Sequence, residues 1–154
     1  ALDLHIHDTD YVQYLFGMPK AVSSFGAEKP GGGLLHIVTQ YLYDDNIVVT
    51  AEGGWGMMPT FGFEMSFNIV MEKATLVYDL TRSPAFRVCP AEGEAFTPQV
   101  KEGDGWFLQI EHFAKSVRGE KVEAITTLKE SMNSVKIVEA EKKSASKGRK
   151  VTIS

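Results

Sequence analysis

Residues 61–80 read FGFEMSFNIVMEKATLVYDL, and this stretch decides the fold. Its first half places an apolar side chain at every second position: Phe61, Phe63, Met65, Phe67, Ile69 and Met71. Side chains of a strand alternate between two faces, so this spacing predicts a strand with one apolar face and one largely polar face. Glu72 and Lys73 form a short turn, after which residues 74–80 return as a second strand. Because a turn this short joins antiparallel strands, the sequence predicts an antiparallel hairpin.

Further strands are predicted on both sides of this hairpin. They cover residues 20–26, 36–43, 47–51 and 86–89, with a short edge strand at 151–153. The turn residues Asp44, Asp45 and Asn46 separate two of these segments and predict a second hairpin. The predicted strands are therefore mainly antiparallel.

Two helices are predicted in the last third of the chain. The first carries Trp106, Ile110, Phe113 and Val117 at the spacing of one helical face, which predicts an apolar stripe that faces the core.

The second of these helices starts at a capping box formed by Thr127 and Glu130 and runs to Gly148. Its predicted apolar stripe consists of Leu128, Met132, Val135 and Val138.

This order of elements predicts an α+β fold. We expect a single domain over residues 1–154, built on an open, mainly antiparallel sheet with helices packed on one face. The other face of the sheet is partly apolar. An uncovered apolar face predicts a homo-oligomer or a missing domain.

The first seventeen residues, ALDLHIHDTDYVQYLFG, hold the richest polar cluster. Five ionisable side chains fall within eight positions: Asp3, His5, His7, Asp8 and Asp10. The pattern predicts a helix that begins near Asp10, is capped by Asp8 or Thr9, and ends at Gly17. Its predicted apolar face consists of Tyr11, Tyr14 and Leu15.

The residues of this cluster allow three interpretations. His5 and His7 form an H-x-H pair of the kind that binds metals on a strand end, but only His36 and His112 remain as further histidines. The chain is also far shorter than the ~250 residues of a β/α barrel, so we predict no metal. Asp3 and His7 are four positions apart and share one face of a helix, where a carboxylate can orient an imidazole for proton transfer. In the third interpretation the acids only cap the helix and His7 is a satisfied, partly buried histidine.

Composition limits the possible partners. The chain has 154 residues, 44% of them hydrophobic, and a net charge of -4, which argues against nucleic acid or an anionic membrane surface as partner. No apolar run is long enough to span a membrane, and no signal peptide is visible. The single cysteine, Cys89, cannot form an internal disulfide, so we expect a reducing, cytoplasmic compartment. Because the chain begins at Ala1, directly before its polar cluster, we expect a fragment of a longer protein.

The opening D-L-x-x-H-D-x-D, followed by a helix ending in L-F-G-x-P, resembles the second domain of the glucose–fructose oxidoreductase / inositol dehydrogenase / MocA family. Residues 61–80 resemble the central hairpin of that family. The stretches GWFLQIEHFAKSVRGEK and TLKESMNSVKIVEAEKKSASKGRKVTI resemble its closing helices. The resemblance covers essentially the whole chain in the right order.

The resemblance implies a site. In that family a dinucleotide-binding domain comes first, and this α+β domain supplies most of the substrate site. Asp3 and His7 match the catalytic Asp and His of the family motif, which act beside a lysine from the first domain. His7 is then the proton acceptor or donor at a substrate hydroxyl or carbonyl, while a hydride moves to or from the nicotinamide. Asp3 orients the substrate or the imidazole, and Asp10 is structural.

The chain also departs from the family pattern. It contains no G-x-G-x-x-G after a strand, so we expect NAD or NADP to bind the parent protein and not this chain. We expect the chain alone to be inactive. His5 stands where the family often has glycine, which either crowds the site or adds a substrate contact. Trp55, beside Gly53 and Gly54, can stack on a sugar or fill the core.

We therefore expect the C-terminal substrate-binding domain of a NAD(P)-dependent oxidoreductase acting on a sugar, an inositol or a related polyol. Two alternatives remain open. One is a non-catalytic sugar-binding or oligomerisation module. The other is a small metal-dependent hydrolase that uses His5 and His7.

Overall fold

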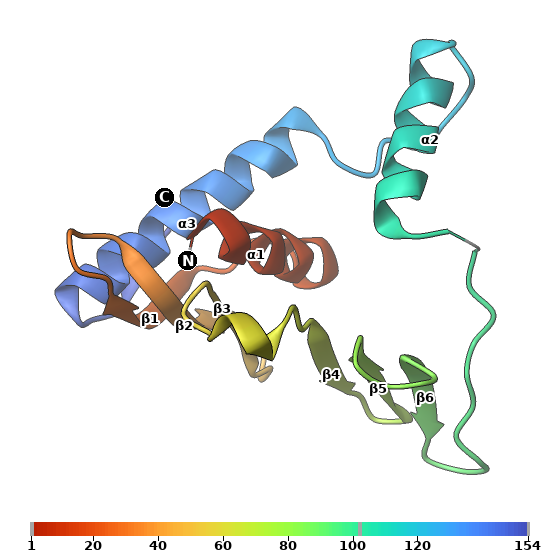
Figure 1. Cartoon of the computed structure of the whole chain (residues 1–154), viewed down its shortest axis with the longest axis horizontal. Coiled ribbons are helices and arrows are strands. Elements are labelled where there is room, and N and C mark those ends of the chain that lie inside the picture. The colour runs from red at the N-terminus through yellow and green to blue at the C-terminus, as the bar shows by residue number, and fades with distance from the viewer. Residues whose placement is uncertain (1, 102, 154) are drawn as a thin grey trace. The chain divides into compact units, whose positions relative to one another are not determined.

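The computed structural model describes residues 2–101 and 103–153. The chain forms two compact units, one made of Ala1–Met57 with Ala124–Ser154 and the other of Met58–Glu123 (Figure 1). The expectation of a single domain over residues 1–154 stays a prediction.

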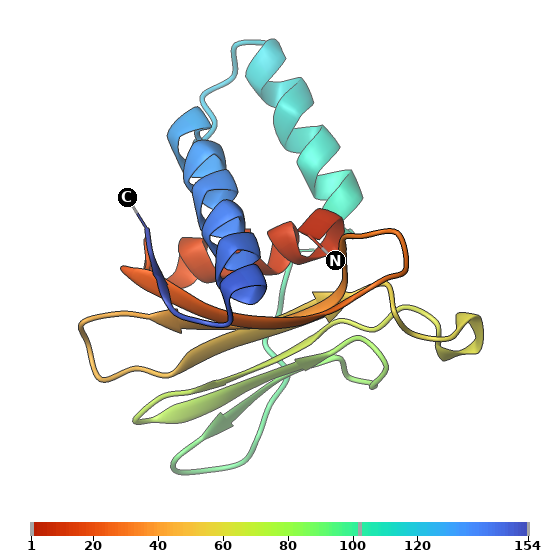
Figure 2. The same cartoon turned by 90° about the vertical axis from the view of Figure 1, so that its left-hand side faces the viewer.

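The first unit is a four-stranded antiparallel sheet with two helices on one face. Its elements are α1 (Leu2–Phe16), β1 (Ala21–Glu28), β2 (Leu34–Leu42), β3 (Val49–Gly54), α3 (Leu128–Lys147) and β7 (Val151–Thr152). The strand order is β3-β2-β1-β7. Helix α3 packs on β1 and helix α1 packs on β3 and on α3, and Figure 2 shows both helices on the same face of the sheet. The predicted hairpin around Asp44–Asn46 is confirmed as β2 and β3, and the predicted edge strand is confirmed as β7.

The core of this unit lies between the helices and the sheet. Its buried apolar side chains are Val12, Val22, Tyr41, Val49, Ile137 and Ala140. Polar side chains are buried in the same layer, among them His5, Thr9, Thr39, Glu141 and Ser144. The helix–sheet interface is therefore partly polar, and its hydrogen bonds have to be satisfied internally.

Helix α1 differs from the prediction in its start and in its buried face. It begins at Leu2, so Asp8 and Thr9 lie inside the helix and do not cap it. The residues that it buries are His5, Thr9, Val12 and Gln13, whereas the predicted apolar face of Tyr11, Tyr14 and Leu15 is exposed. The prediction assumed that the buried face is the apolar one. Burial of His5, Thr9 and Gln13 is tolerated because each finds hydrogen-bond partners inside the fold.

Helix α3 has the predicted ends and a different buried face. The capping box of Thr127 and Glu130 is confirmed, and Gly148 ends the helix in the left-handed conformation at φ 60°. Of the predicted stripe only Val138 is buried, and Leu128 is 92% exposed. The face that contacts α1 and the sheet carries Ser134, Ile137, Glu141 and Ser144. Small hydroxyls fit there because they bond to neighbouring elements, as Ser144 Oγ does by accepting from the Ser24 N–H at 2.9 Å.

The second unit contains a three-stranded antiparallel sheet of order β4-β5-β6. Its elements are a 3-10 turn (Pro59–Phe61), β4 (Ser66–Val70), β5 (Ala74–Asp79), β6 (Phe86–Pro90) and α2 (Gly105–Val117). The predicted central hairpin is confirmed, but its first strand starts at Ser66 and not at Phe61. Pro59 starts the 3-10 turn and Gly62 takes a positive φ of 82°, so Phe61 lies in a turn and not in the strand. The rings of Phe67 and Tyr78 stack across the hairpin, 5.4 Å apart.

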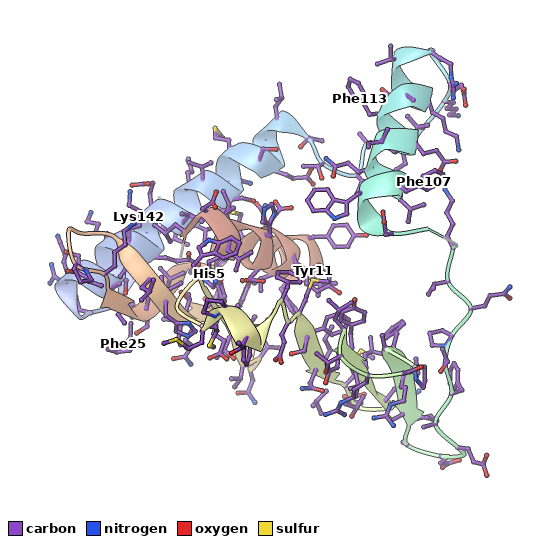
Figure 3. The ribbon with its side chains drawn as sticks, viewed as in Figure 1. His5, Tyr11, Phe25, Phe107, Phe113 and Lys142 are labelled. Atoms are coloured by element: carbon purple, nitrogen blue, oxygen red, sulfur yellow. The ribbon has the colours of Figure 1, made fainter. Side chains whose placement is uncertain are left out.

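Helix α2 forms where it was predicted, with Asp104 accepting a hydrogen bond from the Phe107 N–H at 2.7 Å. Its apolar stripe does not face a core: Trp106, Ile110, Phe113 and Val117 are all exposed, Trp106 by 76%. Figure 3 shows Phe107 and Phe113 projecting from α2. The spacing of apolar residues predicts a helix and its apolar face, but it carries no information on what covers that face.

The fold class is α+β, with open antiparallel sheets and with α1 and α3 packed on one face of the larger sheet. None of the described helices is both long and apolar enough to cross a membrane.

Candidate functional site

The outer face of α1 carries the pair that the sequence singled out. Asp3 and His7 are both exposed, and the helix spans both positions. One helical turn separates positions i and i+4, so the two side chains lie on the same face. The orientation of the His7 imidazole by Asp3 stays a prediction.

His5 lies on the opposite side of the same helix. It is fully buried, whereas His7 is exposed, because positions two apart on a helix point in nearly opposite directions. On this helix the H-x-H pair therefore presents its two imidazoles on opposite faces, unlike an H-x-H pair on a strand end, and a single metal ion cannot bind both in this arrangement. Among the described residues, no group of three or more His, Cys, Asp or Glu side chains is arranged to hold a metal ion.

A groove of about 640 Å³ lies beside His7. It is lined by His7, Asp10, Tyr11, Gln13 and Tyr14 from α1 and by Ile125, Thr126 and Glu130 from the start of α3 and the segment before it. The lining contains carboxylates, an amide, hydroxyls and two aromatic rings, and it contains no lysine or arginine. Such a surface suits a neutral ligand rich in hydroxyl groups, because carboxylate and amide oxygens accept from hydroxyls and aromatic rings contact C–H faces.

The wall of this groove is held by hydrogen bonds between α1 and α3. The Gln13 side-chain nitrogen donates to the Glu130 carbonyl at 3.1 Å and to Ser134 Oγ at 2.9 Å. Ser134 Oγ donates in turn to Asp10 Oδ1 at 2.6 Å. These bonds fix Asp10 to α3 and support a structural role for it.

Gln13 has one buried acceptor without a partner among the described residues. Its side chain is 7% exposed, and its Oε1 atom has no hydrogen-bond partner among the described residues. A buried amide oxygen without a partner costs free energy unless water or a ligand donates to it. Burial and the neighbouring Tyr14 raise the pKa of Tyr11, so its hydroxyl stays protonated and can donate.

The inner face of α1 contacts a second group of polar residues. His5 Nδ1 lies 3.2 Å from Asp8 Oδ2, and His5 Nε2 lies 3.4 Å from the Tyr41 hydroxyl (Figure 3 labels His5). Glu141 Oε2 is 3.7 Å from the same Nε2 atom. In this arrangement His5 does not reach the groove, and its contact with a substrate stays a prediction.

Burial perturbs the acids of this inner group. It raises the pKa of the Glu141 carboxyl, an effect that the nearby His5 opposes, and it raises the pKa of the Tyr41 hydroxyl. Sequence reasoning missed both residues. The signal for Glu141 was its place at core spacing from Ile137 and Ser134 on α3, which an apolar pattern search passes over.

Strand β3 approaches α1 closely at Gly53. A Cβ atom on Gly53 would lie 2.7 Å from Asp8 Oδ2 and 3.2 Å from His5 Nδ1. Gly53 therefore leaves room for the His5–Asp8 contact. Trp55, two residues further on, is 58% exposed and is not among the residues that line the groove. Its role as a sugar platform stays a prediction.

The described residues do not fit a nicotinamide dinucleotide. Every strand pairing in both sheets is antiparallel. A parallel β-α-β unit, which places the pyrophosphate of a dinucleotide at a helix N-terminus, is therefore not found in the described part of the chain.

Comparison with known proteins identifies the family. Residues 1–153 match the family model for the C-terminal alpha/beta domain of the oxidoreductase family. This is the family of glucose–fructose oxidoreductase, inositol dehydrogenase and MocA. The chain belongs to this family. No curated protein matches the chain in a sequence search.

Solved structures share the fold of this family member at low identity. Levoglucosan dehydrogenase in complex with NADH and levoglucosan is 19% identical, with a TM-score of 0.76 over 99% of this chain and 50% of that chain. The WlbA dehydrogenase from Bordetella pertussis in complex with NADH and UDP-GlcNAcA is 18% identical, with a TM-score of 0.73 over 97% of this chain and 43% of that chain. The chain thus spans about half the length of the solved structures that it matches.

Proposed function

We propose that this chain is the substrate-binding part of a NAD(P)-dependent oxidoreductase that acts on a sugar, an inositol or a related polyol. The observation that carries the proposal is the position of His7. It is exposed on α1, one turn from Asp3, and it lines a groove with acceptors and aromatic rings and without a basic side chain. The names of the levoglucosan dehydrogenase and WlbA complexes, which contain NADH with a sugar or a sugar nucleotide, support the same chemistry.

The roles of the residues follow from this placement. His7 takes a proton from a substrate hydroxyl, or returns one to a carbonyl oxygen, and Asp3 orients the imidazole or the substrate. Tyr11 and Tyr14 hold the rest of the substrate in the groove. The cofactor, NAD or NADP, belongs in this proposal to a dinucleotide-binding domain of the parent protein.

A homo-oligomer through the open sheet face is part of the same proposal. In the second unit Phe61, Phe63 and Met65 precede β4 and Met71 follows it, and all four are about half exposed. Exposed apolar side chains next to a sheet favour a protein partner over solvent. The single Cys89 suits a reducing compartment such as the cytoplasm.

The test of catalysis uses the parent protein with its dinucleotide-binding domain. We expect His7→Asn to lower kcat by about 10²- to 10⁴-fold, the usual contribution of a general acid or base. His112→Asn, a histidine outside the groove, is the matched control and leaves kcat unchanged. Full activity of His7→Asn would reject the catalytic assignment and favour the non-catalytic sugar-binding module. The isolated chain, assayed with NAD+ or NADP+ and a panel of sugars, should show no turnover.

A further inference from the structure

The interior of the first unit contains a chain of polar contacts that the proposed function does not use. It joins His5 and Thr9 on α1, Tyr41 on β2 and Glu141 on α3, all at most 1% exposed. Thr9 Oγ1 lies 3.1 Å from Glu141 Oε1 and 3.1 Å from the Tyr41 hydroxyl. The Tyr41 hydroxyl lies 3.4 Å from His5 Nε2, and His5 Nδ1 lies 3.2 Å from Asp8 Oδ2. We call His5, Asp8, Thr9, Tyr41 and Glu141 together the buried chain.

One state of the buried chain follows from the direction in which its hydroxyl groups donate their protons. Each hydroxyl has a single proton to donate. If Glu141 is a carboxylate, Thr9 donates to it, and Tyr41 then donates to Thr9. The remaining contact needs a proton on His5 Nε2, while the proton on Nδ1 is donated to Asp8. In this state His5 is an imidazolium and Glu141 is its buried counter-ion.

The reverse direction gives a second state with the same atoms. If Glu141 carries a proton on Oε1, it donates to Thr9, Thr9 donates to Tyr41, and Tyr41 donates to a bare His5 Nε2. Moving from the first state to the second breaks the Nε2–H bond of His5 and forms the O–H bond of Glu141, while each hydroxyl passes on one proton. The number of protons is the same in both states, and no oxidant or reductant is needed.

The neighbours of His5 decide how the two states differ in free energy. Titratable groups face it from three elements: Asp8 from α1, Tyr41 from β2 and Glu141 from α3. The fourth neighbouring element, β3, presents Gly53, which carries no charge. Glu141 Oε2 has no hydrogen-bond partner among the described residues and lies 3.7 Å from His5 Nε2. An ion pair at this distance offsets part of the cost of burying two charges, and proton transfer removes that cost.

We propose that the buried chain is a reversible proton wire, in which one proton moves between Glu141 and His5 through the hydroxyls of Thr9 and Tyr41. The wire ends at His5, whose Nδ1–H donates to Asp8 in both states, and the Asp8 side chain is 38% exposed. Because its members come from α1, β2 and α3, an intact wire also holds α1 in the orientation that directs Asp3 and His7 outward. The inference does not depend on the oxidoreductase function.

Nitrogen-15 NMR of the His5 ring in the 154-residue chain tests the wire. In the wild type, exchange of the proton predicts an Nε2 shift between the values of a bare and a protonated nitrogen. Glu141→Gln removes the transferable proton, and Tyr41→Phe removes the relay, so each variant should move the Nε2 shift to one limiting value. Glu139→Gln, on the exposed side of the same helix, is the matched control and should leave it unchanged. Identical His5 shifts in the wild type and in Glu141→Gln would overturn the proposal.

A measurement on the wild type alone covers the case in which the variants do not fold. The populations of the two states depend on temperature, so the averaged Nε2 shift should drift as the sample is warmed below its unfolding transition. An Nε2 shift fixed at the bare or at the protonated limit across that range would overturn the wire.

Discussion

The two faces of α1 use polar residues in opposite ways. On the inner face, His5, Thr9 and Gln13 are buried and hydrogen-bonded to β2 and α3. On the outer face, Asp3 and His7 are exposed, and His7 lines a groove. Ionisable residues crowded into one short stretch can therefore serve two purposes, packing inside the fold and facing a ligand. The position of each residue around the helix decides which of the two it serves. Changes on the inner face should alter stability, whereas changes on the outer face should alter binding.

The largest expected effect comes from the apolar part of the inner layer. Ile137 is fully buried between α3 and the sheet. We expect Ile137→Ala to lower the free energy of unfolding by about 2–5 kcal/mol, because it removes buried methyl groups and leaves a cavity. Urea denaturation followed by circular dichroism measures this. A loss below 1 kcal/mol, on the order of a surface change, would show that the helix–sheet layer is not the core.

A smaller effect is expected for the polar part of the same face. Thr9→Val keeps the shape of the side chain but removes the hydroxyl that contacts Tyr41 and Glu141. We expect a loss of about 1–3 kcal/mol, because a buried donor and a buried acceptor lose their partner. Ser131→Ala, on the exposed surface of α3, serves as the comparison. Equal stabilities of the two variants would contradict a polar inner face that contributes to folding.

The pH dependence of stability also distinguishes the inner face from the outer face. Burial raises the pKa of Glu141, so the folded state binds this proton more tightly than the unfolded state does. Its contribution is then complete below the unfolded pKa of about 4.3 and is lost as pH rises through the folded pKa. As pH rises through the folded pKa of Glu141, we expect the Tm of the wild type to fall more steeply than the Tm of Glu141→Gln. Parallel Tm profiles would show that Glu141 is not perturbed.

The smallest stability effect is expected on the outer face. Tyr14 is exposed and lines the groove. Tyr14→Ala should change the free energy of unfolding by no more than about 0.5 kcal/mol, while weakening the binding of a polyol. Calorimetric unfolding and a ligand titration on the same sample separate the two quantities. A large loss of stability would place Tyr14 in the core and remove the contrast between the two faces.

Much of the fold could be predicted from the sequence because turns, caps and periodicity are local signals. The hairpin at 61–80, the capping box of Thr127 and Glu130, and the left-handed Gly148 depend only on neighbouring residues. The buried faces of α1 and α3 could not be predicted in this way. They depend on partners such as Tyr41 and Glu141, which are far away in the sequence and make polar residues fit the interior.

The candidate site was predictable only through its family motif. From the residues alone, the spacing of Asp3 and His7 favoured a helix cap over a catalytic pair. In the structure both side chains share one exposed face of the helix. The other groove residues, such as Gln13 and Thr126, come from segments more than a hundred positions apart. No local pattern in the sequence brings these two segments together.

The most direct test of the account is an NMR titration of the chain with sugars, inositols and linear polyols at millimolar concentrations. We predict shift changes at His7, Tyr11 and Tyr14, with none at His5 or Tyr41 on the inner face. Tyr11→Ala should weaken the response without unfolding the chain. A panel in which no polyol perturbs the groove, or in which the changes map to the inner face, would contradict the central claim that the outer face of α1 binds the substrate.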